Sequence, residues 1–311
     1  MNIKEEIRRM CREKNAVIMA HYYTDGEIQD MADFVGDSLA LAQKAATTDA
    51  DIIVMCGVHF MGETSKILCP DKKVLVPDLE ATCSLAESCP ADKFAEFVAE
   101  HPGHTVISYV NTTAATKAVT DIVVTSSNAR EIVESLPQDT PIIFGPDRNL
   151  GGYINSITGR NMLLWDGACH VHEKFSVEKI IELKNQYPDA KVLVHPECKG
   201  AVVKLADKVG STAALLKYSI NDSSDIFIVA TESGILHEMQ KACPEKTFIP
   251  APPSDSTCAC NECSYMKLVT MQKLYDCLKN EAPEIHVDSE VAEKAIVSIN
   301  RMLEISEKLG L

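Results

Sequence analysis

Three short polar triplets recur along the chain at a nearly constant interval. They are spaced 88 and 86 residues apart, each follows an apolar run typical of a buried strand, and they read His21-Tyr22-Tyr23, Tyr109-Val110-Asn111 and His195-Pro196-Glu197. Imidazole, phenol, carboxylate and amide groups are side chains that move protons and donate hydrogen bonds at active sites. Polar residues at matching strand ends predict three copies of one supersecondary unit, with equivalent loops.

Six residues of these triplets are candidates for one pocket. A single histidine after a strand is often only a hydrogen-bonded polar group, but His21 and His195 occupy the same phase of two repeats. We therefore expect them to face each other across an axis. The other expected members of the pocket are Tyr23, Tyr109, Asn111 and Glu197.

A second set of small polar residues keeps the same interval. Its chemically useful members are Ser38, Ser126, Ser211 and Thr212, which stand where helices are expected to begin. Helix capping is a sufficient explanation for such residues. The same helix ends also present free amides and a positive dipole, so they could bind the anionic groups of a substrate.

Cysteines follow the last strand-like run of each repeat. Cys83 and Cys169 close the first two repeats, and the CACNEC segment at 258–263 closes the third. Three thiolates around an axis could hold an iron-sulfur cluster with one iron left open as a Lewis acid. The alternative is that Cys83 and Cys169 are core residues and CACNEC is a local zinc knuckle. Six other cysteines are expected to be ordinary buried residues, namely Cys11, Cys56, Cys69, Cys198, Cys243 and Cys277.

The elements that must position these residues alternate between strand and helix. Ten continuous apolar runs are typical of parallel strands covered on both faces, and they lie at 16–20, 51–55, 73–77, 104–110, 121–125, 140–144, 161–165, 191–195, 225–230 and 246–250. Helical patterns separate them, and a long helix is expected from Asp288 onward. The pattern predicts an α/β fold of three pseudo-threefold-related units, each with a small parallel sheet, around a central site.

The expected units divide the chain at the cysteine loops. The first comprises residues 1–84 with the C-terminal helix at 285–311, the second 85–170 and the third 171–257, while 258–284 carries a cluster-ligand segment and a helix. In the segment GPDRNLGGY (145–153) we expect Asp147 and Arg148 to form a structural ion pair.

Composition excludes several classes of protein. The 311-residue chain is 46% hydrophobic, enough for two or three cores, and its formal net charge of −15 argues against a nucleic-acid surface. No apolar stretch approaches the roughly 20 residues that span a bilayer, so no membrane association and a cytoplasmic location are expected.

As an ordered set, the motifs resemble those of the quinolinate synthase A protein family over nearly the full length. The stretches that carry this resemblance are AHYYTDGEIQDMADFVGDS, GVHFMGETSKIL, VPDLEATCSLA, YVNTTAATK, TSSNA, FGPDRNLGGY, GACHVHEKF, VHPEC, VGST and ATESGILH. The resemblance implies an enzyme of de novo NAD biosynthesis. Its reaction condenses iminoaspartate with dihydroxyacetone phosphate to quinolinate, with loss of phosphate and two waters. It also implies three pseudo-threefold units and one 4Fe-4S cluster held by three cysteines, with an open iron site.

Roles follow from the resemblance motif by motif. Cys83 and Cys169 are expected cluster ligands; Tyr23, Tyr109, His195 and Glu197 are expected catalytic residues. The expected substrate-binding residues are His21, Ser38, Asn111, Ser126, Ser211 and Thr212. An iminoaspartate-producing enzyme, L-aspartate oxidase or aspartate dehydrogenase, is an expected transient partner.

The repeat interval and the family resemblance select different cysteines as the third cluster ligand. Repeating the 86-residue interval from Cys169 reaches position 255, for which Cys258 is the nearest cysteine. The resemblance instead places the ligand before a Met at a helix start, which selects Cys263 ahead of Met266. A thiolate at a helix N-terminus is also expected to have a lowered pKa, so we choose Cys263. Oxidation of the Cys260–Cys263 CxxC pair to a disulfide is a further hypothesis.

Two other classes remain as alternatives. A non-catalytic iron-sulfur redox sensor would need the cysteines but not the histidine, tyrosine and glutamate set. Another enzyme with one cluster cysteine per repeat, of the diphthamide-synthesis or isoprenoid-diphosphate reductase type, would need different motifs.

Overall fold

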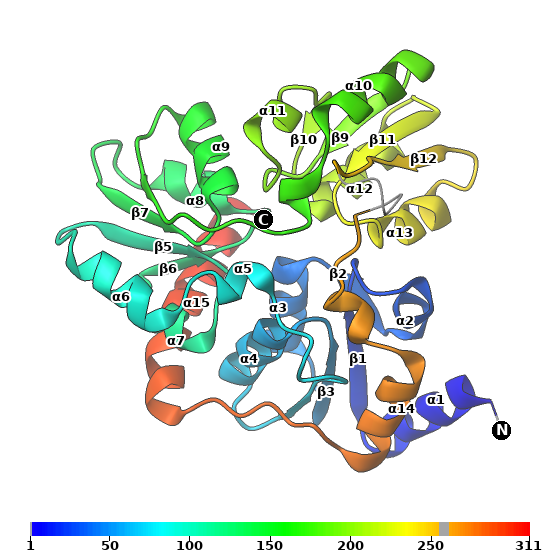
Figure 1. The fold of residues 1–311 in the computed structure, drawn as a ribbon. Coiled ribbons are helices and arrows are strands. Elements are labelled where there is room, and N and C mark those ends of the chain that lie inside the picture. The colour runs from blue at the N-terminus through cyan, green and yellow to red at the C-terminus, as the bar shows by residue number, and fades with distance from the viewer. Residues whose placement is uncertain (1, 255–260) are drawn as a thin grey trace.

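Three small parallel sheets build the molecule. In the computed structural model, which describes residues 2–254 and 261–311, each sheet has four strands and the same internal strand order. The orders are β2-β1-β3-β4, β6-β5-β7-β8 and β10-β9-β11-β12. Three lobes, one per sheet, surround a common centre (Figure 1). The expected α/β fold of three repeated units is therefore confirmed.

The strands are short, and the two central strands of each sheet are mostly apolar and buried. They are β1 Ala16–His21, β2 Phe34–Gly36, β3 Ile52–Cys56, β4 Lys73–Leu75, β5 Thr105–Tyr109, β6 Ile122–Val124, β7 Ile142–Gly145, β8 Leu163–Leu164, β9 Lys191–Val194, β10 Lys208–Val209, β11 Ile226–Ala230 and β12 Thr247–Pro250. All ten expected runs contain a strand. The two that were not expected, β2 and β10, are edge strands of two or three residues, too short to show a periodic signal.

Helices cover both faces of each sheet, as parallel strands require. They are α1 Ile3–Glu13, α2 Gly26–Met31, α3 Ser38–Thr47, α4 His59–Leu68, α5 Ser84–Glu87, α6 Ala91–Ala99, α7 Ala114–Lys117, α8 Ala129–Ser135, α9 Arg148–Thr158, α10 Val177–Gln186, α11 Gly200–Val203, α12 Thr212–Asn221, α13 Ile235–Ala242, α14 Met271–Asn280 and α15 Ser289–Leu309, with 3-10 turns η1 His172–Lys174 and η2 Met266–Leu268. None of the described helices combines the length and the apolar character needed to cross a bilayer.

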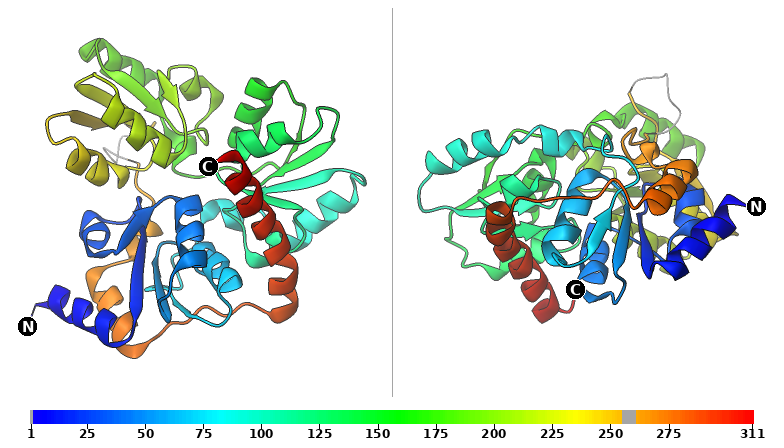
Figure 2. Two further views of the ribbon diagram at one scale, coloured as in Figure 1. Left: turned by 180° about the vertical axis from the view of Figure 1, so that it is seen from behind. Right: turned by 90° about the horizontal axis from the view of Figure 1, so that it is seen from below.

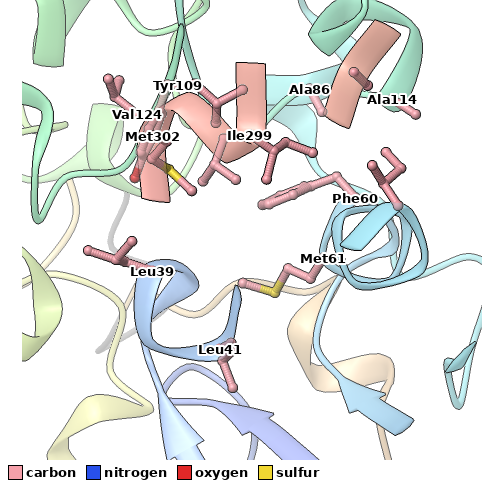
Figure 3. Packing of buried hydrophobic residues seen from close by; sticks show 14 of the residues in the cluster. Leu39, Leu41, Phe60, Met61, Ala86, Tyr109, Ala114, Val124, Ile299 and Met302 are labelled. Carbon is pink, nitrogen blue, oxygen red and sulfur yellow. The ribbon is translucent and has the colours of Figure 1, made fainter. Parts of the chain in front are cut away.

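The C-terminal helix α15 joins the first two lobes. Asp288 caps its first turn by accepting from the backbone N–H groups of Glu290 and Val291. It packs on β6, α7 and α8 of the second lobe and on α4 of the first, and Figure 2 shows it crossing between them. Ile299 and Met302 lie in one apolar cluster with Phe60, Tyr109 and Val124 (Figure 3). The division into units at 84, 170 and 257 stays a prediction.

The expected buried cysteines are confirmed. Cys11, Cys56, Cys69, Cys198, Cys243 and Cys277 all pack in the interior as free thiols.

Candidate active site

A cavity lies where the carboxyl ends of the three sheets meet. It encloses roughly 640 Å³ of empty space, open solvent included. Twelve of the thirteen predicted site residues line it, and they are His21, Tyr23, Ser38, Cys83, Tyr109, Asn111, Ser126, Cys169, His195, Glu197, Thr212 and Cys263. Ser211 is the exception. The repeat therefore brings together side chains from all three units.

The two histidines are held in the same way by the backbone that follows them. The Tyr23 N–H donates to His21 Nδ1 at 3.2 Å, and the Glu197 N–H donates to His195 Nδ1 at 3.4 Å. Because Nδ1 accepts in both rings, the proton of each neutral imidazole lies on Nε2. In His195 this Nε2 lies 3.3 Å from Ser126 Oγ. Burial lowers the pKa of each histidine to about 3, against an opposing effect of Glu197. Both rings are therefore neutral hydrogen-bond donors at neutral pH.

Tyr23 stands at one end of a chain of polar contacts. Its hydroxyl lies 2.7 Å from Thr212 Oγ1 and 2.8 Å from Thr231 Oγ1. Thr231 Oγ1 in turn lies 2.9 Å from His172 Nε2. Burial, reinforced by Glu197, raises the pKa of Tyr23 well above its ordinary value. The phenol is therefore protonated at neutral pH and can donate.

Glu197 closes the other end of this chain. His172 Nδ1 lies 3.1 Å from Glu197 Oε2, although the angle leaves that nitrogen without a regular hydrogen bond. The Tyr109 hydroxyl donates to Glu197 Oε1 at 2.5 Å. Burial alone would raise the pKa of Glu197, but His172 and His195 outweigh it and lower the pKa to about 2. The carboxylate is therefore ionised beside two protonated phenols.

Asn111 projects into the cavity from a braced turn. Its side-chain Oδ1 is buried and has no hydrogen-bond partner within the described protein. The turn is held by the fully buried Lys117, whose ammonium donates to the carbonyls of Val110 (2.8 Å) and Thr112. Burial lowers the pKa of Lys117 to about 8, with Glu63 opposing the shift. The bonds from Lys117 thus fix the turn that carries Asn111 at the cavity wall.

The helix starts converge on the cavity, but not in identical ways. Ser38 and Thr212 are the first residues of α3 and α12, and Ser211 caps α12 by accepting from the Ala214 N–H. Ser126 lies in the turn before α8, so the expected helix start is wrong for this residue. Ser127 Oγ lies 2.6 Å from Asp37 Oδ2 and 2.8 Å from Ser211 Oγ, and so joins the three units.

The three cysteines enter the cavity from three loops. Cys83 precedes α5, Cys169 precedes η1 and Cys263 precedes η2. Burial raises the pKa of all three thiols, that of Cys83 to about 12. Backbone N–H groups of the following turn oppose this increase at each sulfur, as they would stabilise a thiolate.

Two expectations about these loops are wrong. Cys263 does not open a long helix: it precedes a 3-10 turn, α14 begins only at Met271, and burial raises rather than lowers the pKa of the thiol. Asp147 does not pair with Arg148, which pairs with Asp166 and Glu173 instead. The fully buried Asp147 accepts hydrogen bonds from the backbone N–H groups of Leu150 and Cys169. Cys258 and Cys260 lie outside the described residues.

Comparison with known proteins identifies the family of this chain. A family model described as quinolinate synthetase A protein matches residues 5–304. The quinolinate synthase of Thermosynechococcus vestitus is 56% identical, covering 98% of this chain and 96% of its own length. Those of Microcystis aeruginosa and Chloroherpeton thalassium are 57% and 54% identical, with at least 94% of either chain covered. This chain belongs to the quinolinate synthetase A family.

Reasoning from the sequence missed several residues in and around the cavity of this quinolinate synthetase A family member. His172, Glu232, Asp37 and the apolar Phe60 line the cavity. Thr231 contacts two of the lining residues, Tyr23 and His172, through its hydroxyl. His172 sits in CHVH beside His170, and spacing alone does not show which histidine points inward. Thr231 and Glu232 directly follow β11, which is the one signal that could have found them.

Proposed function

We propose that this chain condenses iminoaspartate with dihydroxyacetone phosphate, releases phosphate and two waters, and so forms quinolinate for NAD biosynthesis. The cavity lined by His21, Tyr23, Tyr109, His195 and Glu197 is the observation that carries this proposal. The family membership supports the same activity.

The substrates carry a phosphate and two carboxylates, so their binding needs donors rather than bases. The hydroxyls of Ser38, Ser126 and Thr212, the Nε2–H groups of His21 and His195, and the amide of Asn111 are such donors. The starts of α3 and α12 add backbone amides and a positive dipole. Ser211 acts indirectly in this proposal, through its cap on α12 and its contact with Ser127.

We assign the proton transfers to side chains that the cavity holds in different protonation states. The ionised Glu197 can accept a proton, whereas Tyr23, Tyr109 and the Nε2–H of His195 can donate one. We assign Tyr23 and His195 to the ketose-to-aldose isomerisation and to the loss of phosphate as the aspartate-derived enamine attacks the triose carbon. Ring closure then follows through the nitrogen. Glu197 handles the proton of the final dehydration.

The donor set fits a cluster of the family type. Cys83, Cys169 and Cys263 would hold one 4Fe-4S cluster by three thiolates, because all three line the cavity and each sulfur faces stabilising backbone N–H groups. Such a cluster supplies an open iron that acts as a Lewis acid toward a hydroxyl or carboxylate. Its place beside Glu197 would put acid and base chemistry in the same cavity.

One competing arrangement uses fewer cysteines. Ligand atoms of Cys169, His172 and Glu197 lie within 4.8 Å of one another, which would suit a single divalent ion. It would leave Cys83 and Cys263 without a role, so we favour the three-thiolate cluster. Iron and sulfide analysis of anaerobically purified protein separates the two, since only the cluster contains acid-labile sulfide.

An anaerobic synthesis assay tests the proposed function. Iminoaspartate is generated in the reaction by L-aspartate oxidase or aspartate dehydrogenase, the partner enzymes that we propose, and dihydroxyacetone phosphate is added. Formation of quinolinate that depends on both substrates is expected. A brown, cluster-containing protein that forms no quinolinate would contradict the synthase and favour the sensor.

A further inference from the structure

The buried carboxylate of Glu232 holds the backbone of a proposed cluster ligand. Glu232 lies two residues after the end of β11 and is completely buried. Oε1 accepts a hydrogen bond from the Cys263 N–H at 3.1 Å, and Oε2 accepts one from the Gly234 N–H at 2.7 Å. Both carboxylate oxygens therefore bind backbone groups, so an amide could replace only one of the two acceptors.

Lys267 extends this contact to the catalytic loop of the first unit. Its ammonium lies 3.3 Å from Glu232 Oε1 and 3.4 Å from Asp25 Oδ1. It also donates to the backbone carbonyl of Tyr23 at 2.9 Å. A lysine ammonium has three protons, and here three segments of the chain supply one acceptor each.

Asp147 provides an internal comparison within the same fold. It also accepts from the backbone N–H of a proposed ligand, Cys169, at 3.2 Å. The neighbouring cation Arg148 turns away from it to Asp166 and Glu173. Asp147 thus holds its cysteine alone, whereas Glu232 is tied through Lys267 to a catalytic loop.

We propose that Glu232 and Lys267 form a positioning pair that fixes the third cysteine ligand and the Tyr23 loop relative to each other. This proposal rests on the ligand set and the catalytic role of Tyr23 given above. The pair joins the cluster segment to the first and third units, so disturbing it loosens both ends together. Removing the lysine also leaves a buried carboxylate without its counter-ion, which is the costly way to break a buried pair.

The test uses the full-length, cluster-loaded protein and two measurements that do not depend on turnover. The first is the rate at which a ferrous-iron chelator removes iron, and the second is the dissociation constant for quinolinate under anaerobic conditions. In Lys267→Met we expect the iron content of the parent protein, faster loss of iron and about tenfold weaker binding of quinolinate or more. Lys267→Arg, which keeps the charge, should recover part of both losses.

Lys241→Met is the matched control. Lys241 of α13 pairs with Asp30 of α2 at 3.2 Å, so it joins the same two units through an exposed ion pair that includes neither Tyr23 nor Cys263. This control should behave like the parent protein. Equal losses in Lys241→Met and Lys267→Met would overturn the proposal, because any contact between the two units would then suffice.

A double variant keeps the test decisive if Lys267→Met does not fold. Glu232→Gln/Lys267→Met removes both charges of the pair, so no unpaired charge is left there. It still lacks one of the two carboxylate acceptors and the bond from Lys267 to the Tyr23 carbonyl. Faster loss of iron and weaker binding of quinolinate should therefore persist. If the double variant releases iron and binds quinolinate as the parent protein does, the positioning role of the pair is wrong, while the ligand assignment and the proposed function still stand. A parent protein that takes up no iron would overturn the ligand assignment, and this proposal with it.

Discussion

At the scale of single residues, two histidines have their protonation state set by the next turn of backbone. His21 and His195 each accept an N–H bond on Nδ1 from the residue two positions on, and each is buried. Neutral rings result, with Nε2–H groups available to the cavity. The two repeats therefore share the hydrogen bond to Nδ1 and the neutral state of the ring, as well as the residue type.

Acid should destabilise the fold through these histidines. Their pKa of about 3 in the folded protein lies below the 6.5 of an unfolded chain. Between these values the unfolded chain binds a proton that the folded one does not, so the unfolding free energy falls as pH falls, by up to about 1.4 kcal/mol per pH unit for each histidine. We expect the unfolding free energy, measured by urea denaturation at pH 6 and pH 5, to decrease less between these two pH values in His195→Asn than in the parent protein. The exposed His286 supplies the control His286→Asn, and equal slopes in all three proteins would contradict the burial argument.

Two further single substitutions should separate proton transfer from cluster binding. Tyr23→Phe removes the hydroxyl shared by Thr212 and Thr231, and Glu197→Gln removes the ionised carboxylate. Both variants keep the side-chain shape, so iron content should match the parent protein while turnover falls by about 100-fold or more. Tyr22→Phe, at the neighbouring position outside the cavity lining, is the control. Near-normal quinolinate yield would remove the affected residue from the mechanism.

At the scale of elements, α12 assigns different tasks to two adjacent residues. Ser211 is its N-cap and bonds the Ala214 N–H, whereas Thr212 turns its hydroxyl to Tyr23 inside the cavity. Helix capping and the contact with Tyr23 in the cavity are therefore divided between two adjacent residues.

This division can be measured with two alanine variants. Ser211→Ala should lose about 1 kcal/mol of unfolding free energy, as is usual for a lost N-cap. Thr212→Ala should keep its stability and raise KM, because a lost hydrogen bond to a charged group costs about 1.5 to 3 kcal/mol. Neither should change the iron content. Unchanged kinetics together with a loss of stability in Thr212→Ala would show that its hydroxyl is purely structural.

The elements also show where reasoning from the sequence ends. Buried strands such as Ile52–Cys56 are continuous apolar runs, and their carboxyl ends place the polar triplets without further information. Short edge strands and single-turn helices leave no periodic signal, so Phe34–Gly36 and the 3-10 turn after Cys263 were not found. The role of Glu232 depends on contacts with residues from distant segments, which spacing does not reveal.

At the scale of the whole molecule, one cysteine from each of three loops reaches the central cavity. Cys83 and Cys169 keep the interval of the repeat, but Cys263 does not, because more residues separate it from β12 than separate Cys83 from β4 or Cys169 from β8. The place of Cys263 therefore follows from the segment before η2, which lines the cavity, and not from the repeat interval. Backbone N–H groups of Tyr265 and Met266 meet the Cys263 sulfur there, and Glu232 holds its backbone.

Variants of the CACNEC segment decide whether this position or the repeat interval identifies the ligand. Cys263→Ala should abolish cluster binding, since two thiolates cannot replace three at a site built from separate loops. Cys258→Ala and Cys260→Ala, the matched controls in the same segment, should keep full iron, sulfide and activity under reducing conditions. Oxidation should lower the cluster content of the parent protein but not of Cys260→Ala, if a Cys260–Cys263 disulfide withdraws the ligand. Full cluster content in Cys263→Ala, with loss in Cys258→Ala, would show that the interval of the repeat was the better guide.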